Sequence, residues 1–142
     1  MDERIAREAE AVEFGQSLSG LGINLVVSDV ERAAQFLQQV FDMTIYRSDR
    51  DFGVIGTHGT VFQLHADHTY SSNPLLSLLP ENGARGGGAE LRLYNMDPDL
   101  CEKRALDLGY VVLRGSEDRP HGLRECFILD PDGYCWVPGA AI

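Results

Sequence analysis

The beginning of this chain occurs twice in its sequence, and this repeat constrains the fold more than any other feature. Residues 22–29 read GINLVVSD, and residues 90–97 read ELRLYNMD. In each stretch apolar residues alternate with other types up to a closing Asp, which is strand periodicity, and a run with helical periodicity follows. A strand and a helix repeated in this way predict two copies of one small unit. The alternation along each strand then predicts which side chains line a cleft between the sheets.

The first copy predicts a strand, a helix and three further strands. The strand covers 22–27, and the helix starts within the sequence SDVE, where Ser28 and Glu31 match a capping box. The helix has an apolar stripe of Ala33, Ala34, Leu37, Val40 and Phe41. Three strands are expected over 43–48, 51–56 and 60–66, with turns at Asp49-Arg50 and at His58-Gly59.

The second copy predicts the same order of elements. A strand is expected over 89–94 and a helix over 98–108, with Asp97 as its cap and Gly109 at its end. Further strands are expected over 110–114, 124–130 and 134–138, and the sequence DPDG at 130–133 is a strong turn signal between the last two.

The repeat divides the chain into an N-terminal helical extension (1–19), a first module (20–66), a linker (67–88) and a second module (89–142). The extension predicts one short helix over 2–17 that docks on a partner subunit or frays. The linker contains GARGGG, which favours a flexible hinge over a phosphate loop because no Lys-Ser/Thr follows. Its four leucines predict a cover for the cleft or contact with a second subunit. They are Leu75, Leu76, Leu78 and Leu79.

Composition narrows the class of partner. The net charge is −10 and Lys103 is the only lysine, which argues against nucleic acid and is compatible with a cationic small ligand. An acidic surface that only maintains solubility is the alternative. No apolar run has the roughly 18 residues of a membrane span, and the acidic start lacks a signal-peptide pattern. Three cysteines without CxxC spacing favour a reducing compartment, so we expect a cytoplasmic protein.

Two longer motifs resemble a known superfamily. LVVSDVERAAQFLQQVFDM in the first half and GLRECFILDPDGYCW near the end are similar to the first strand-helix and the closing hairpin of vicinal-oxygen-chelate proteins, the glyoxalase/bleomycin-resistance/dioxygenase fold. The closing segment of this chain, RPHGLRECFILDPDGYCW, is most similar to that of bleomycin-resistance proteins. The resemblance covers roughly residues 20–140. It implies an α+β fold of two tandem βαβββ modules with curled mixed sheets around a shared cleft, often in a homodimer.

The resemblance also bears on metal binding. Enzymes of this superfamily hold a divalent cation through the first and last strand of each module, and those four places map onto Gly22, Gln63, Glu90 and Val137. Gly22 and Val137 have no donor atom, so two ligands remain, which is too few for a tight site. A set of Gln63, His65 and Glu90 is the alternative, because His65 shares a strand face with Gln63. We therefore expect no cofactor, with a divalent metal as the alternative.

Strand alternation predicts the ligand-binding side chains. The predicted contacts are Asn24, Phe52, Gln63, His65, Glu90, Arg92 and Tyr94. Polar groups of this kind among apolar residues are typical of a small-molecule pocket. Glu90 and Arg92 are neighbours on one face, so an ion pair between them is the structural alternative. Cys135 beside His121 is a weak candidate nucleophile, because a buried cysteine is usually inert. We predict no catalytic residue.

Three functions follow as hypotheses. The first is a binding protein of the bleomycin-resistance type that holds a small, cationic aromatic molecule in its cleft without metal and without turnover. The second is a metal-dependent lyase, isomerase or dioxygenase of the same superfamily, or a metal-free enzyme with Glu90 as its base. The third is a regulatory or structural dimer with a vestigial cleft. The missing donors at Gly22 and Val137 favour the first.

Overall fold

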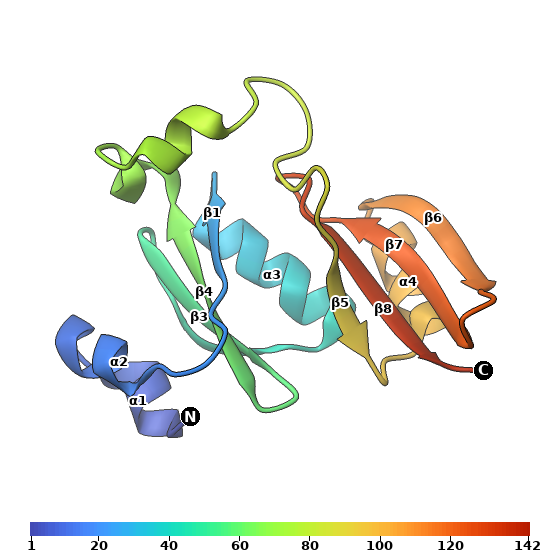
Figure 1. Cartoon of the computed structure of the whole chain (residues 1–142), viewed down its shortest axis with the longest axis horizontal. Coiled ribbons are helices and arrows are strands. Elements are labelled where there is room, and N and C mark those ends of the chain that lie inside the picture. Colours follow the sequence, from blue (N-terminus) through green and yellow to red (C-terminus); the bar gives the residue numbers. More distant parts are fainter. The chain divides into compact units, whose positions relative to one another are not determined.

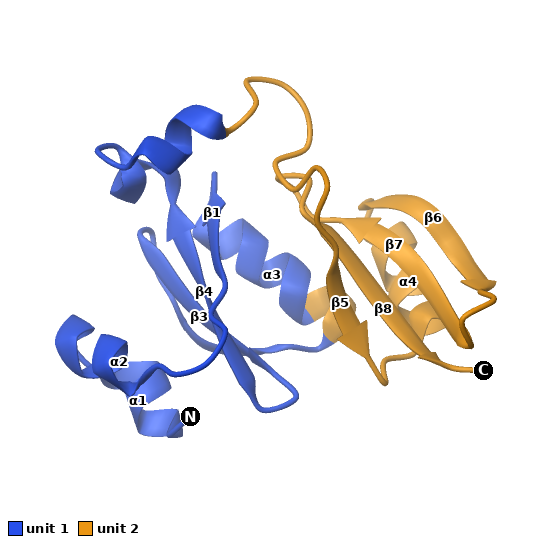
Figure 2. Cartoon of the chain, in the orientation of Figure 1, with its two compact units in different colours: residues 1–38, 42–78 blue, residues 39–41, 79–142 orange.

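The computed structural model describes residues 1–142 and divides them into two compact units. Unit 1 comprises Met1–Gln38 and Asp42–Leu78, and unit 2 comprises Gln39–Phe41 and Leu79–Ile142 (Figure 2). Each unit contains a four-stranded mixed sheet. The predicted α+β fold of two tandem βαβββ modules is therefore confirmed. None of the helices has the length and apolar character to cross a membrane.

The sheet of unit 1 has the strand order β1-β4-β3-β2 (Figure 1). Its strands are β1 (Asn24–Val27), β2 (Thr44–Ser48), β3 (Phe52–Thr57) and β4 (Thr60–Ala66), close to the predicted ranges. β1 runs parallel to β4 and places Asn24 opposite Gln63 and Val26 opposite His65. His58 and Gly59 both have positive φ, as the predicted two-residue hairpin turn requires.

Helix α3 (Val30–Phe41) carries the predicted apolar stripe, and all five of its members are buried. Its cap differs from the prediction. The Asp29 carboxylate, not the Ser28 hydroxyl, accepts the bond from the backbone N–H of Arg32, at 3.0 Å. Asp29 immediately precedes the helix in an extended conformation, so its carboxylate reaches the first turn. Ser28 instead accepts a bond from the Arg32 guanidinium at 3.1 Å.

The N-terminal extension forms two short helices, α1 (Glu3–Glu8) and α2 (Ala11–Ser17), instead of one. Ala9 and Glu10 between them are extended, which breaks the helical periodicity. As a result Val12 is 70% exposed and Phe14 is buried. Ala6, Ala9 and Phe14 pack with Val54 of β3, so both helices cover the open face of the unit 1 sheet.

The sheet of unit 2 has the strand order β5-β8-β7-β6. Its elements are β5 (Leu91–Tyr94), α4 (Pro98–Asp107), β6 (Val111–Asp118), β7 (Leu123–Leu129) and β8 (Cys135–Ala141). The Asp97 carboxylate caps α4 as predicted, accepting from the backbone N–H of Asp99 and Leu100. β6 and β8 extend beyond the predicted ends, since bulges in β6 and the buried Pro138 and Gly139 of β8 do not interrupt pairing.

The linker contains two short 3-10 helices, η1 (Asp67–Tyr70) and η2 (Pro74–Leu78). Leu75 and Leu78 are exposed. The glycine-rich part that follows differs from the flexible hinge expected from its composition, because it packs against the turn at 130–133. A Cβ atom on Gly133 would lie 2.5 Å from Cα of Ala84, and one on Gly86 would lie 2.8 Å from Cα of Tyr134. These glycines allow two backbone segments of unit 2 to approach closely.

Phe14 is expected to be the side chain that holds the N-terminal helices on the sheet. Phe14→Ala removes a ring that is 5% exposed, and this should lower the free energy of local opening of α1 and α2 by about 3 kcal/mol. Hydrogen–deuterium exchange of residues 3–17 measures the opening. Val12→Ala is the matched control on the same helix, and it should leave exchange unchanged because Val12 is exposed. Equal exchange in the two variants would contradict the assignment.

Candidate functional site

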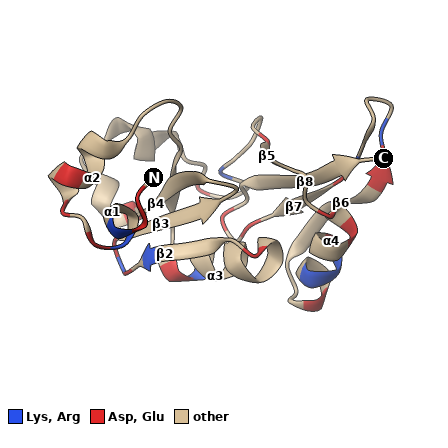
Figure 3. Cartoon of the chain, turned by 90° about the horizontal axis from the view of Figure 1, so that it is seen from below, with Lys and Arg blue, Asp and Glu red and all other residues tan.

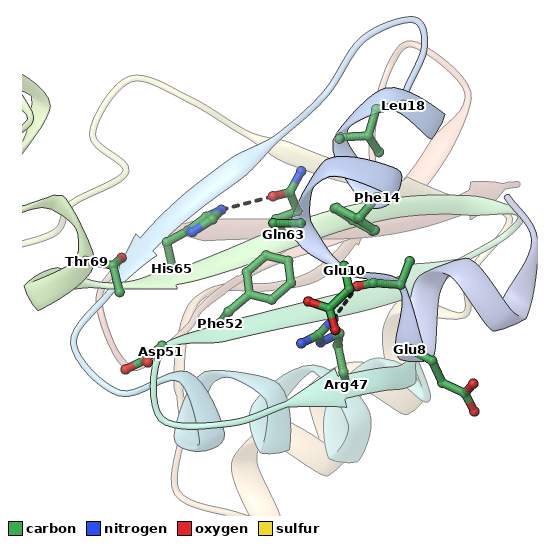
Figure 4. Close-up of a pocket in the computed structure, with 13 residues that line it drawn as sticks. Glu8, Glu10, Phe14, Leu18, Arg47, Asp51, Phe52, Gln63, His65 and Thr69 are labelled. Atoms are coloured by element: carbon green, nitrogen blue, oxygen red, sulfur yellow. Dashed lines mark hydrogen bonds between the residues drawn. The ribbon is translucent and has the colours of Figure 1, made fainter.

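A pocket of about 510 Å³ lies in unit 1 between the N-terminal helices and the open face of the sheet (Figure 4). The helical segment supplies more than half of its lining, and the rest comes from β2, β3, β4 and the adjoining loops. Helices and strands thus meet around one concave space, which is the usual form of a small-molecule site. The lining residues are Glu8, Ala9, Glu10, Ala11, Phe14, Gly15, Leu18, Arg47, Asp51, Phe52, Gln63, His65 and Thr69.

Aromatic rings in contact form one side of this pocket. Phe14 meets Phe52 edge-to-face with ring centroids 5.8 Å apart. Phe52 lies 5.1 Å from His65, and His65 lies 5.4 Å from Tyr70. Strand pairing produces this row, because Phe52 of β3 is directly opposite His65 of β4. Such a surface can stack or edge-pack a flat ring.

Gln63 and His65 provide polar groups on the same face. His65 Nε2 lies 3.0 Å from Gln63 Oε1, and an amide oxygen can only accept, so Nε2 carries the proton. Burial lowers the pKa of the His65 imidazole below its ordinary value of 6.5. His65 is therefore neutral at pH 7, with Nδ1 as an acceptor. The Gln63 amide nitrogen remains as a donor.

Arg47 of β2 brings a positive charge into the pocket lining. One guanidinium nitrogen donates to the backbone carbonyl oxygen of Ala9 at 3.2 Å. The guanidinium carbon lies 5.2 Å from the centre of the Phe52 ring, within cation–π range. Arg47 thus connects the break between α1 and α2 to the sheet, as Figure 4 shows.

Three carboxylates also line the pocket, and all are exposed. They are Glu8, Glu10 and Asp51. In Figure 4 the side chain of Glu8 points away from the aromatic rings. Asp51 pairs with His68, with Nε2 2.5 Å from Oδ1. The pocket therefore combines an apolar interior with negative charge at its exposed edge.

A second polar cluster lies on β5 and β7 of unit 2. Arg92 donates to Glu90 at 2.8 Å and to the buried Glu125, and its guanidinium carbon lies 5.7 Å from the Tyr94 ring centre. His121 Nε2 lies 3.3 Å from Glu125. Burial raises the pKa of the Glu125 carboxyl, but the hydrogen bond and charge of Arg92 outweigh burial and leave it below its ordinary value. The ion pair expected as an alternative for Glu90 and Arg92 is thus present.

The predicted site residues divide between these two places. Phe52, Gln63 and His65 line the unit 1 pocket, and the exposed Asn24 lies opposite Gln63 on β1 outside that lining. Glu90, Arg92 and Tyr94 belong to unit 2, where they contact one another.

Sequence reasoning missed Phe14, Arg47 and Glu125. Alternation along 43–48 would place Arg47 on the face of Ile45, and only the bulge between these two residues sets Arg47 opposite Val54 on the open face. Glu125 lies in a predicted strand, and alternation could have assigned its face, which it shares with Gly139 opposite. No local pattern places Phe14 over the sheet, because that contact depends on the helix break at Ala9 and Glu10.

The residues at the superfamily's four metal positions do not fit a metal ion. Gly22 has no side chain and Val137 is a buried hydrocarbon. The Glu90 carboxylate is paired with Arg92, and the Gln63 oxygen is bonded to His65. No group of three or more His, Cys, Asp or Glu side chains in the chain could hold a metal ion. The donor chemistry at these positions therefore does not match a transition-metal site.

Comparisons with known proteins agree with this architecture. Residues 21–137 match the family model for the Glyoxalase/Bleomycin resistance protein/Dioxygenase superfamily. No curated protein matches the chain significantly. Solved structures with the same fold include a hypothetical protein from S. aureus, with a TM-score of 0.71 and 19% identity over 92% of this chain and 99% of that one.

Two further solved structures have similar scores. A glyoxalase/bleomycin resistance protein/dioxygenase family enzyme from Burkholderia phytofirmans PsJN has a TM-score of 0.69 and 16% identity, covering 84% of this chain and 96% of that one. A glyoxalase-related enzyme from Fulvimarina pelagi has a TM-score of 0.68 and 20% identity, covering 87% and 88%. At these identities the likeness shows the fold alone.

The half-buried, neutral His65 is expected to make the protein sensitive to acid. The unfolded chain binds the His65 proton near pH 6.5, whereas the folded chain binds it only at lower pH. The stability associated with neutral His65 is therefore complete above pH 6.5 and decreases as the pH falls below it. Urea unfolding between pH 7.5 and 5 measures this decrease. His65→Gln, which cannot titrate, should show a smaller decrease, and an identical decrease would contradict the prediction.

Proposed function

The chain belongs to the glyoxalase/bleomycin resistance protein/dioxygenase superfamily, and on that premise we propose that unit 1 binds a small aromatic molecule in the pocket beneath α1 and α2, without a metal ion. The observation that carries the proposal is the row of contacting rings of Phe14, Phe52 and His65 that lines this pocket. A volume of about 510 Å³ suits a molecule of one to three fused rings.

The polar groups of the pocket suit recognition of such a molecule. The Gln63 amide offers a donor and His65 Nδ1 an acceptor beside the rings. A small number of polar groups among apolar ones can orient a ligand without a large desolvation cost. The net charge of −10 and the exposed carboxylates at the pocket edge favour a ligand that carries positive charge.

Binding without turnover is the better supported role. Superfamily chemistry requires a metal that polarises substrate oxygens, and the donors for it do not fit here. The Glu90 carboxylate, the candidate base for metal-free chemistry, is paired with Arg92. The enzymatic alternative therefore lacks a poised acid–base group at the predicted position.

We extend the proposal to a homodimer in the cytoplasm. The exposed Leu75 and Leu78 of η2 offer apolar contact area to a second copy. Cys101, Cys126 and Cys135 are all free, which agrees with a reducing compartment. Light scattering of the purified protein tests the dimer.

The binding proposal predicts that Phe52→Ala weakens aromatic ligands by about tenfold, because it removes the central ring of the row. A thermal-shift screen of cationic aromatic compounds selects ligands, and calorimetry compares the variants. Glu90→Ala is the contrasting variant, since Glu90 belongs to the unit 2 cluster. Loss of affinity in Glu90→Ala but not in Phe52→Ala would assign the binding site to unit 2 instead of unit 1.

Metal content is measured in the same preparation, after exposure to Mn, Fe, Ni and Zn salts and desalting. We expect no stoichiometric metal. One equivalent of a single metal per chain would favour the enzymatic alternative over the binding role.

A further inference from the structure

Arg47 is a half-buried cation in the pocket lining without a carboxylate partner. Its protein contacts are the Ala9 carbonyl oxygen and the Phe52 ring. A guanidinium has five N–H donors, so most of its donors have no acceptor from the protein. Glu8, Glu10 and Asp51 also line the pocket, but none of them forms an ion pair with Arg47.

Two other arginines of this chain have carboxylate partners. Arg92, also half-buried, pairs with both Glu90 and Glu125. Arg124 pairs with both Asp99 and Asp118. Removing a guanidinium from water is costly unless an anion compensates it. Arg47 has partly lost its water and has no such anion, so it keeps donors that the acceptor of a ligand can use.

We propose that Arg47 binds an anionic group of the ligand, a carboxylate or another planar oxyanion. This inference rests on the proposed function, since it assigns a chemical class to the molecule in the same pocket. Two further features support a planar anion. The guanidinium is held in place by Ala9 and Phe52, so little conformational entropy is lost on binding. Its remaining donors form a fork that matches two oxygens at once.

The proposed ligand class follows from all the charges in the pocket. The ring contacts Phe14, Phe52 or His65, and the anionic group lies at Arg47. Glu10 adjoins Ala9, to which Arg47 is bonded, so its carboxylate favours a cationic group close to the anionic one. An aromatic zwitterion, such as an aromatic amino acid or its derivative, has the ring, the anionic group and the cationic group.

The acidic net charge does not oppose this assignment at short range. Charges beyond the Debye length of about 8 Å are largely screened at physiological ionic strength. The net charge of −10 therefore slows the approach of an anion more than it weakens a contact already made. Affinity depends mainly on the group that the anion meets in the pocket.

Four probes that share an indole ring and carry differently charged side chains test the proposal. They are 3-methylindole, tryptamine, indole-3-propionate and tryptophan. Affinities for the wild-type protein and for Arg47→Gln are measured by NMR titration. Arg47→Gln should weaken indole-3-propionate and tryptophan by about tenfold, because a charge-assisted hydrogen-bond pair is lost. It should change 3-methylindole and tryptamine by about twofold or less.

Arg50→Gln is the matched control. It changes the net charge by the same amount on a residue that does not line this pocket, so all four affinities should stay within about twofold. Arg47→Lys keeps the charge but not the fork and should retain part of the preference for the anionic probes. Unchanged binding of 3-methylindole shows that the variant pocket is still formed.

Each alternative outcome overturns a different statement. Equal losses for all four probes in Arg47→Gln would make Arg47 a structural contact and overturn the inference. Tighter binding of tryptamine to Arg47→Gln than to the wild-type protein, with no loss for indole-3-propionate, would assign a purely cationic ligand and leave the proposed function standing. No perturbation of Phe52 or His65 signals by any probe would overturn both.

Discussion

The alternation of side chains along β4 is the constraint on which unit 1 depends. β4 lies between β1 and β3, so its two faces set the two faces of the sheet. Phe62, Leu64 and Ala66 are buried on one face, while Gln63 and His65 are on the other. A shift of one residue in the pairing would bury an amide and an imidazole and expose the three apolar side chains. The register that forms the core therefore also places the pocket's polar groups.

The open face of this sheet carries apolar side chains that need to be covered. Val54 and Phe52 of β3 are apolar, and water would otherwise cover them. Ala6, Ala9 and Phe14 remove that area from water, with Phe14 contributing about 2 to 3 kcal/mol and each alanine methyl group about 1 kcal/mol. The covering helices are interrupted at Ala9, where the extended backbone leaves a carbonyl oxygen that Arg47 can reach. The pocket thus forms where the N-terminal segment and the sheet do not fill the space between them.

Local periodicity was sufficient to predict most strands, both long helices and the faces of Gln63 and His65. These features depend on residues two to four positions apart, which a sequence shows directly. The partners of Arg47 and Arg92 depend on contacts between distant segments: Ala9 is 38 residues from Arg47, and Glu125 is 33 residues from Arg92. The cap at Asp29 was missed for a smaller reason, since Ser28 and Asp29 are both good caps and only the backbone angles decide between them.

The family match begins at residue 21, whereas the two short helices that cover the sheet lie entirely before it. The lining of the pocket therefore comes from both parts of the chain: residues 8–18 lie before the match, and Arg47, Phe52 and His65 lie within it. Substitutions in the N-terminal segment can thus alter one wall of the pocket without touching the strand pairing that forms the other.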